Sequence, residues 1–235
     1  MIKKIIRKIV YREKENSVSY VKYLRKKGVR IGERTMFFAP MKTCIDLTRP
    51  WLIEIGDDVQ ITEGVAILTH GYEWSVLKHA YGEVLGSSGK VKIGNNVFIG
   101  MHTTILKGVS VGNNVIIGAN SLLTKDVPDN CVVAGNPARV LMSLDEYYER
   151  RKTAQLQEAQ ELAREFYEVN GKEPDTQELR EFFWLFEDKE ENLPEIWRHV
   201  MTLTGNEEET YKMFKTHQKA FESKEDFLKS IKSKG

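Results

Sequence analysis

The sequence predicts a mainly β fold, a three-sided parallel β-helix with a helical segment before it and a helical region after it. Three observations between residues 92 and 128 predict the β-helix. Aliphatic residues recur at every sixth position, the pentapeptide IGNNV at 93–97 returns as VGNNV at 111–115, and glycine and asparagine fall at fixed points of the repeat. Period six fits neither an α-helix nor a plain strand, and hexapeptide periodicity is typical of a parallel β-helix.

Each six-residue step forms one side of a triangular coil. The aliphatic residue points inward and stacks on its equivalents in the coils above and below, and a small or β-branched residue four positions later also faces inward. Glycine, asparagine and aspartate accept the backbone angles that the corners require. Three sides make one coil, which explains why the pentapeptide returns after three steps. The inward aliphatic residues are Ile93, Ile99, Ile105, Val111, Ile117 and Leu123.

The same phase continues upstream, with two interruptions. Ile55 and Ile93 are 38 positions apart, which is one 18-residue coil and 20 further residues. We therefore expect an insertion at roughly residues 71–90 that leaves the prism. Ile31 and Ile55 are separated by one coil and an excess of six positions, which predicts a six-residue bulge within residues 43–54. Such extra residues lie on loops, where function tends to be found.

Helical patterns predict the two flanking regions. Residues 2–27 look helical, because the apolar residues from Ile2 to Val10 follow the spacing of one helix face and Gly28 is a plausible stop. From Ser143 onward the pattern is helical and acidic, and the apolar stretch FFWLF at 182–186 is expected to be core or subunit contact. We therefore divide the chain into an N-terminal helical segment (1–28), a β-helix domain (29–142) and a C-terminal helical region (143–235).

The net charge of +1 is unevenly distributed. Residues 1–30 hold 11 basic and 2 acidic side chains, whereas residues 143–235 hold 15 and 22. The basic N-terminus could contact an anionic membrane surface, although we favour a solvated helix or one paired with the acidic C-terminal region. The remaining chain offers no basic stripe for nucleic acid. No apolar run approaches the roughly 20 residues of a membrane span, and two cysteines form no disulfide framework, so we expect a cytoplasmic protein.

Three strings carry a resemblance to a known family: IEIGDDVQITEGVAILTHG (53–71), VKIGNNVFIG (91–100) and IIGANSLLTKDVPDNCVVAGNPARVL (116–141). Through them, residues 29–142 resemble the left-handed β-helix acetyltransferases of the maltose and galactoside O-acetyltransferase type. The resemblance implies a left-handed coil, which the usual right-handed crossover rule would not predict. It also implies acetyl-CoA as the co-substrate and a homotrimer with acetyl-CoA lying between neighbouring prisms.

Acetyl transfer to a hydroxyl needs a base, and a neutral histidine suits this role near pH 7. His70 lies where the coil breaks into the long loop, a position that equally fits a corner hydrogen bond, and it matches the family's catalytic histidine. Counting sides places Asp46 on the same face as His70, one rung or about 5 Å away. Asp46 stands where the galactoside enzymes have an acceptor-binding asparagine, so it could orient His70, bind the acceptor or do both.

The resemblance also assigns contacts to acetyl-CoA by matched positions. Basic side chains suit the anionic nucleotide end of the molecule. Two positions depart from the family, because Met101 replaces a small residue and Met142 replaces a second arginine. The matched contacts are the backbone of Met101 and Ala119, the pair Thr124 and Lys125, and Arg139 facing the phosphates.

The acceptor is predicted to be a sugar hydroxyl on a glycan precursor, as in polysaccharide biosynthesis. Tyr72 and Trp74, in the loop at 71–90, could stack on a sugar ring or simply anchor the loop. Direct attack fits better than an acyl-enzyme, since no histidine is linked in sequence to Cys44. The alternatives are an N-acetyltransferase acting on an amino sugar or xenobiotic, and a catalytically inactive β-helix scaffold. A zinc-dependent β-helix carbonic anhydrase needs two histidines five positions apart, a spacing that is absent, so we expect no metal.

Overall fold

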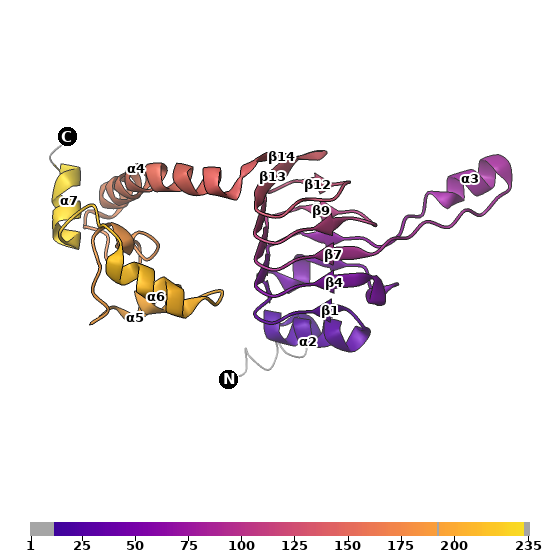
Figure 1. The fold of residues 1–235 in the computed structure, drawn as a ribbon, viewed down its shortest axis with the longest axis horizontal. Coiled ribbons are helices and arrows are strands. Elements are labelled where there is room, and N and C mark those ends of the chain that lie inside the picture. Colours follow the sequence, from indigo (N-terminus) through magenta and orange to yellow (C-terminus); the bar gives the residue numbers. More distant parts are fainter. Residues whose placement is uncertain (1–11, 192, 233–235) are drawn as a thin grey trace. The chain divides into compact units, whose positions relative to one another are not determined.

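The computed structural model describes residues 12–191 and 193–232, and the chain divides into two compact units, residues 1–147 and 148–235. Each unit has its own hydrophobic core. Figure 1 shows the coils in the first unit and the helices in the second. The helix face predicted from Ile2 to Val10 lies outside the described residues.

Three sheets form the three sides of the coil (Figure 1), and every strand pair but one within the described residues is parallel. The exception is the antiparallel pair β13–β14, which ends the second sheet. The fold therefore has the predicted parallel β-strands followed by C-terminal helices. In spatial order the first sheet is β1 (Arg30–Ile31), β4 (Ile53–Ile55), β7 (Val91–Ile93) and β10 (Ser110–Val111); the second is β2 (Met36–Phe37), β5 (Val59–Ile61), β8 (Val97–Ile99), β11 (Val115–Ile117), β13 (Cys131–Gly135) and β14 (Ala138–Ser143); the third is β3 (Cys44–Ile45), β6 (Ala66–Ile67), β9 (Thr104–Ile105) and β12 (Leu122–Leu123).

The return of the pentapeptide after three steps is the register between successive coils. Ile93 pairs with Val111, Ile99 with Ile117 and Ile105 with Leu123. Ile55 pairs with Ile93, so the predicted insertion leaves the coil between β6 and β7. The insertion contains a short helix that the sequence analysis did not anticipate, α3 (Trp74–Tyr81), which is closed by Gly82 in the left-handed region.

The six extra residues of the first coil are not in one place, so the prediction of a single bulge within residues 43–54 was wrong. Ile45 pairs with Ile67, which makes the step from Phe37 to Ile45 eight positions and the step from Ile45 to Ile55 ten. Two extra residues therefore precede Ile45 and four follow it. Each excursion forms one 3₁₀ turn that begins with a proline, η2 (Pro40–Lys42) and η3 (Pro50–Leu52), because proline is suited to the first helical position.

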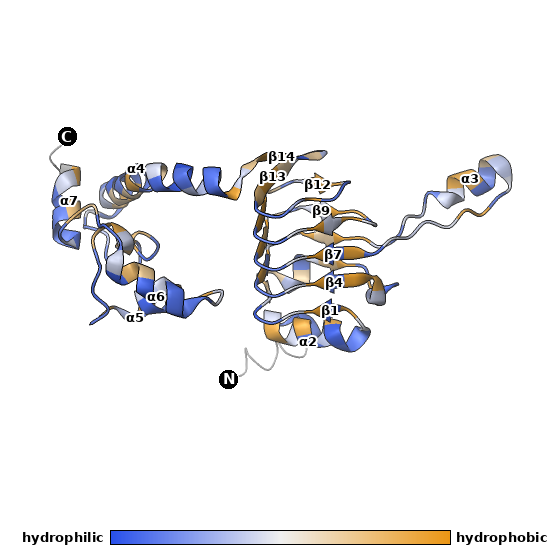
Figure 2. Ribbon diagram, viewed as in Figure 1, coloured by the Kyte–Doolittle hydropathy of each residue, from blue (hydrophilic) through white to orange (hydrophobic). Residues whose placement is uncertain are grey.

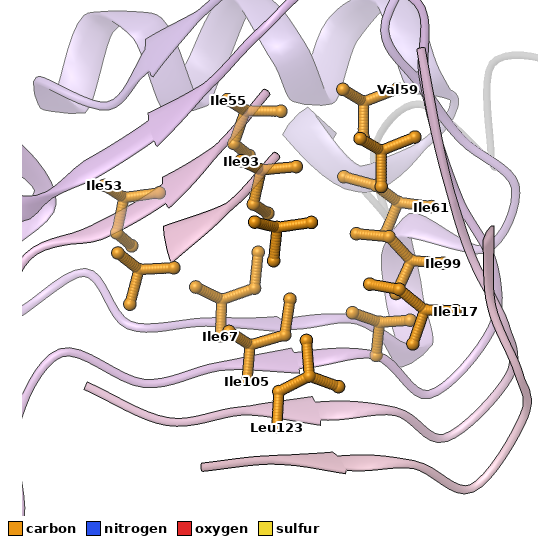
Figure 3. Packing of buried hydrophobic residues seen from close by; sticks show 14 of the residues in the cluster. Ile53, Ile55, Val59, Ile61, Ile67, Ile93, Ile99, Ile105, Ile117 and Leu123 are labelled. Atoms are coloured by element: carbon orange, nitrogen blue, oxygen red, sulfur yellow. The ribbon is translucent and has the colours of Figure 1, made fainter. Parts of the chain in front are cut away.

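The core of the first unit consists of columns of inward aliphatic side chains (Figure 3). One column stacks Ile61, Ile99 and Ile117, each with no exposed surface. The six aliphatic residues predicted to face inward are all at most 3% exposed. Burying a side chain of this size stabilises the fold by about 1.5–3 kcal/mol relative to leaving it in water. The hydrophobic columns thus hold the coil in register.

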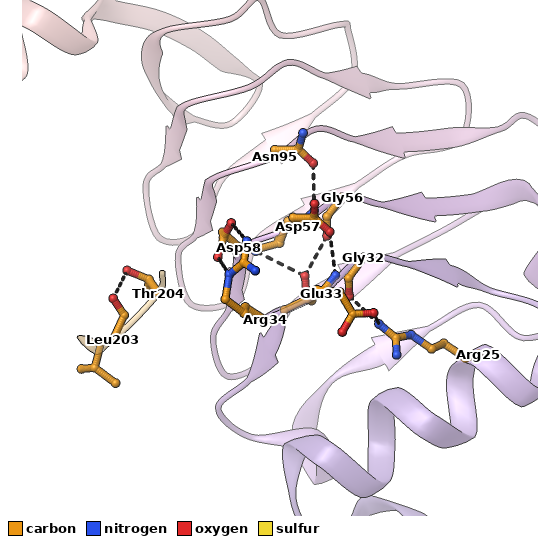
Figure 4. Close-up of polar contacts among 12 residues, drawn as sticks. Arg25, Gly32, Glu33, Arg34, Gly56, Asp57, Asp58, Asn95, Leu203 and Thr204 are labelled. Carbon is orange, nitrogen blue, oxygen red and sulfur yellow. Dashed lines mark hydrogen bonds and ion pairs between the residues drawn. The ribbon is translucent and has the colours of Figure 1, made fainter. Parts of the chain in front are cut away.

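Polar ladders run along one corner of the coil. The backbone N–H of Asp57 donates to Oδ1 of Asn95 at 2.8 Å, and the N–H of Asn95 donates to Oδ1 of Asn113 at 2.9 Å. The neighbouring corner residue adopts a positive φ, and in the first coils Arg34 and Asp58 occupy that position and form an ion pair at 2.6 Å (Figure 4). Asparagine and aspartate tolerate this conformation better than most residues, which explains their repetition.

Helix α2 (Ser17–Lys27) follows the 3₁₀ turn η1 (Arg12–Lys14) and covers the first coil with one face. Tyr20 and Leu24 are buried in the core of the coil, and the remaining surface of the helix is mainly polar (Figure 2). Asn16 caps its start by accepting from the N–H of Ser19 at 3.0 Å. Gly28 ends it with φ 104°, a conformation that favours glycine.

The second unit is helical. Helix α4 (Leu144–Asn170) crosses the boundary between the units, and it is followed by η4 (Phe183–Leu185), α5 (Glu195–Thr202), α6 (Glu207–Thr216) and α7 (Lys224–Lys232). Phe183, Leu185 and Phe186 are buried in the core of this unit, as expected of the apolar stretch at 182–186. None of the helices in the described ranges is both long and apolar enough to span a bilayer.

Candidate active site

Two neighbouring strand ends bring Asp46 and His70 together. Asp46 directly follows β3, and its N–H donates to the carbonyl of Ile67 in β6 at 3.0 Å. His70 lies three residues beyond β6 and forms an antiparallel bridge with Ser88 at the base of the inserted loop. Nδ1 of His70 lies 2.6 Å from Oδ2 of Asp46. The pair that the sequence places on one face is therefore in direct hydrogen-bond contact.

Five donors surround the Asp46 carboxylate. Thr48 supplies its N–H at 3.0 Å and its hydroxyl at 2.6 Å to Oδ1. Thr69 supplies its N–H at 3.1 Å and its hydroxyl at 2.5 Å to Oδ2, which also receives His70. The Asp46 side chain is 5% exposed and Thr69 is fully buried, whereas the His70 side chain keeps 30% of its surface exposed. The carboxylate is thus enclosed and the imidazole is open on one side.

The hydrogen bonds decide the charge of Asp46. Burial alone would raise the pKa of this carboxyl, but the donors from Thr48, Thr69 and His70 outweigh burial and hold the pKa well below its usual range. Asp46 is therefore ionised and can only accept hydrogen bonds. It follows that in the neutral imidazole Nδ1 of His70 carries the proton and Nε2 keeps a free lone pair. A histidine in this state can act as a base.

Comparisons with known proteins agree with the fold. The model of the bacterial transferase hexapeptide family (six repeats) matches residues 90–125. Protein CapG of Staphylococcus aureus is 47% identical over 125 residues, which cover 53% of this chain and 71% of CapG. The chain belongs to the hexapeptide-repeat transferase family. Membership, together with the acetyltransferases among the relatives, confirms the predicted enzyme class, an acyltransferase.

Two further relatives of this hexapeptide transferase have named activities. Galactoside O-acetyltransferase of Escherichia coli (strain K12) is 40% identical over 96 residues, 41% of this chain and 46% of that enzyme. A hexapeptide-repeat acetyltransferase from Vibrio cholerae O1 biovar eltor, solved in complex with acetyl coenzyme A, is 32% identical and covers 50% of this chain and 61% of its own, with a TM-score of 0.43. The chain thus spans less than half of the galactoside enzyme.

The residues expected to contact acetyl-CoA lie on the outside of the later coils. Met101 and Ala119 occupy equivalent corners of successive coils and are exposed. Within residues 12–191 and 193–232, neither of their backbone N–H groups donates a hydrogen bond, so both remain available to a ligand. Thr124, Lys125 and Arg139 lie on the surface as well, and Arg139 donates to the carbonyl of Ala138 at 2.8 Å. Among the described residues none of these five forms a hydrogen bond or ion pair with Asp46 or His70.

The inserted loop is tied to the coil at its base. Tyr72 and Trp74 pack on each other with ring centroids 4.7 Å apart, and Tyr72 is 69% exposed. Between them, Glu73 forms an ion pair with Lys107 at 2.8 Å. Hydrogen bonds from Lys107, which has the larger effect, and from Ser87 lower the pKa of Glu73 to about 2. The Glu73–Lys107 ion pair joins the start of the loop to the coil, and the aromatic pair leaves the ring of Tyr72 accessible.

Thr48 and Thr69 were not among the site residues predicted from the sequence. The spacing of Asp46 and Thr48, two residues apart, is the usual signal of a side chain that turns back on its own backbone, and it could have identified Thr48. Thr69 carries no comparable signal, because its hydroxyl reaches a carboxylate 23 residues earlier in the chain.

Three other histidines, His79, His102 and His217, form no hydrogen bond or ion pair with Asp46 or His70 among the described residues. His102 occupies a corner with φ 59°, and His79 is exposed on α3. In the helical unit, the two ring nitrogens of His217 face the carbonyls of Phe214 and Trp184 at 2.6 and 2.8 Å. In the part of the chain that the structure describes, no cluster of three or more histidine, cysteine or acidic side chains could hold a metal ion.

Proposed function

We propose that this chain is an acetyl-CoA-dependent O-acetyltransferase that acetylates a hydroxyl of a sugar or glycan precursor, with His70 as the general base. The observation that carries the proposal is the 2.6 Å contact between Nδ1 of His70 and the buried, ionised carboxylate of Asp46. In the neutral imidazole this contact places the proton on Nδ1 and leaves a lone pair on Nε2. The family supports acyl transfer, and the O-acetyltransferase among the relatives supports a hydroxyl acceptor.

In the proposed reaction, Nε2 of His70 removes the proton of the acceptor hydroxyl as its oxygen attacks the thioester carbonyl. The new C–O bond forms, the C–S bond breaks, and the leaving thiolate takes the proton back from the imidazolium to give free CoA. Asp46 stabilises the imidazolium while it exists. No acyl-enzyme is needed, and Cys131 is a poor nucleophile because burial and then Asp129 raise the pKa of its thiol.

Of the two roles left open for Asp46, we propose orientation of His70 rather than binding of the acceptor. An ionised carboxylate offers about four lone-pair positions. Five donors from Thr48, Thr69 and His70 already converge on its two oxygens. No position remains for an acceptor hydroxyl, so we assign acceptor contact to the aromatic pair Tyr72 and Trp74.

The acetyl-CoA site is proposed along the corners that carry Met101 and Ala119. Their N–H groups, which donate to no other described residue, are suited to the carbonyls of the pantetheine arm, and two surface cations, Lys125 and Arg139, are suited to the phosphates. We further propose a left-handed coil and a homotrimer that shares this site between neighbouring prisms. The outward side chains Met36 and Phe98, 39% and 42% exposed on the second sheet, support contact between copies.

Cellular context is also part of the proposal. We propose a cytoplasmic enzyme of polysaccharide biosynthesis in which the basic side chains of α2 are solvated, with weak contact to an anionic membrane surface as the alternative. In the described residues, Lys22 and Lys26 lie one turn apart on α2 and form no ion pair. Basic side chains near an anionic membrane surface contribute about 1 kcal/mol each, so in this alternative the six cations and two acids of residues 12–27 favour reversible contact.

The function is tested by measuring thiol release from acetyl-CoA with a panel of sugars, for the wild type and for His70→Ala. We expect turnover with at least one sugar and a fall of about 100-fold or more in the variant, the lower end of what a general base contributes. Unchanged turnover in His70→Ala would remove His70 from the mechanism. An O-acetyl product supports the proposal, whereas an N-acetyl product would favour acetylation of an amino sugar or xenobiotic. Absence of turnover with every acceptor would favour an inactive scaffold.

A further inference from the structure

We infer that Thr48 and Thr69 are positioning residues for acetyl transfer, which act through Asp46 by fixing the plane of its carboxylate toward His70. The inference rests on the proposed function, because it concerns the same base. It assigns a role to two side chains that make no contact with the reacting atoms.

The two threonines hold opposite oxygens of the same carboxylate. Thr48 donates its N–H and hydroxyl to Oδ1, and Thr69 donates its N–H and hydroxyl to Oδ2. Thr48 follows β3 and Thr69 follows β6, so the carboxylate is held from two successive rungs of the coil. With both oxygens fixed, Oδ2 faces Nδ1 of His70, 2.6 Å away, and shares its lone pairs between this ring and Thr69.

Thr48 also selects the tautomer of the neutral imidazole. Its hydroxyl oxygen lies 3.3 Å from Nδ1 of His70 and 2.6 Å from Oδ1 of Asp46. A hydroxyl has one proton to donate, and that proton lies on the shorter contact to Asp46. The oxygen can therefore only accept from Nδ1. Nδ1 thus faces two acceptors, Asp46 and Thr48, and the tautomer with the proton on Nδ1 is the one that satisfies them.

A role of the two threonines in stability alone predicts a different outcome. If the threonines only satisfied a buried carboxylate, their loss would lower stability and leave the turnover of the folded enzyme unchanged. If they position Asp46 toward His70, their loss lowers kcat and leaves KM for acetyl-CoA unchanged. Their effect must also depend on the presence of Asp46.

The test is a double-mutant cycle with Thr48→Val, Thr69→Val and Asp46→Ala in the full chain, measured by thiol release. Valine keeps the shape of threonine and removes the hydroxyl. We expect each valine variant to lower kcat by about 10-fold, as for the loss of a hydrogen bond to a charged group. Thr48→Ser and Thr69→Ser should restore kcat. In the Asp46→Ala background, each valine substitution should lower kcat further by less than about two-fold.

Thr35→Val is the matched control. Thr35 is 8% exposed, and its hydroxyl donates to the carbonyl of Gly56 at 2.8 Å rather than to a carboxylate. We expect it to retain the wild-type kcat. Should Thr69→Val fail to fold, Thr48→Val, at the more exposed of the two positions, completes the cycle. If the valine substitutions lower kcat equally with and without Asp46, the inference is overturned and His70 remains the base. An active His70→Ala would instead overturn the proposed function itself.

Discussion

Nδ1 of His70 lies 2.6 Å from Oδ2 of Asp46, although the two residues are 24 positions apart. Both follow strands of the third sheet, at points where the chain leaves the regular six-residue step. Four extra residues follow Ile45, and the long insertion follows Ile67. The two irregular excursions thus begin on successive rungs at the same edge, and the coil stacks them side by side. The proposed base therefore lies where the repeat is interrupted, on loops that are not committed to the packing of the regular sides.

Replacing Asp46 by asparagine tests whether it orients His70. The asparagine side chain keeps the shape but presents an amide in place of a charge that stabilises imidazolium. We expect kcat to fall on the order of 100-fold or more, with KM for acetyl-CoA unchanged. Steady-state kinetics of Asp46→Asn will measure both. A variant in which only KM for the acceptor rises would show instead that Asp46 contacts the acceptor.

The same carboxylate makes stability depend on pH. The pKa of Asp46 is lower in the folded state than the value of about 3.9 typical of an unfolded chain. A lowered folded-state pKa stabilises the fold fully above the unfolded value, and this contribution is lost as the pH falls through the folded-state value. The free energy of unfolding of the wild type should therefore exceed that of Asp46→Asn most clearly above about pH 4, and the gap should narrow below it. Urea unfolding of both proteins on either side of about pH 4 will measure the gap, and a constant gap would contradict this account.

Much of the fold and part of the site follow from the sequence alone. The register of Ile93 on Val111 was predictable because a column of buried side chains permits only one spacing. Counting sides from that register was enough to place Asp46 near His70. The division of the six extra residues was not predictable from spacing, because it depends on two separate turns at Pro40 and Pro50. The hydroxyl of Thr69 was missed since its partner comes from another rung.

Arg139 tests the proposed acetyl-CoA site. Arg139→Ala removes a surface cation expected to meet the phosphates, so KM for acetyl-CoA should rise about 10-fold, as for loss of a charge-assisted hydrogen bond, at unchanged kcat. Acetyl-pantetheine is the decisive control because it lacks the nucleotide phosphates. The variant should use this short thioester as well as the wild type does. Lys92→Ala, an exposed cation on β7, should behave as wild type with both donors. A loss with both donors would place Arg139 elsewhere in the mechanism.

The ion pair between Glu73 and Lys107 holds the start of the inserted loop against the coil at 2.8 Å. The ends of this loop are also joined by the N–H of Gly71 to Ser87 and the N–H of Gly89 to Thr69, so the substitution Lys107→Met should release the loop without unfolding its base. An exposed pair contributes up to about 1 kcal/mol, so the population of released loops should rise by up to about five-fold. Trypsin cleavage after Lys78 on α3 will report this change.

Acetyl-CoA turnover without acceptor should stay the same, while KM for the acceptor should rise. The exchanged pair Glu73→Lys with Lys107→Glu should restore slow cleavage after Lys78, whereas rapid cleavage at that bond in the exchanged protein would mean that the pair does not secure the loop.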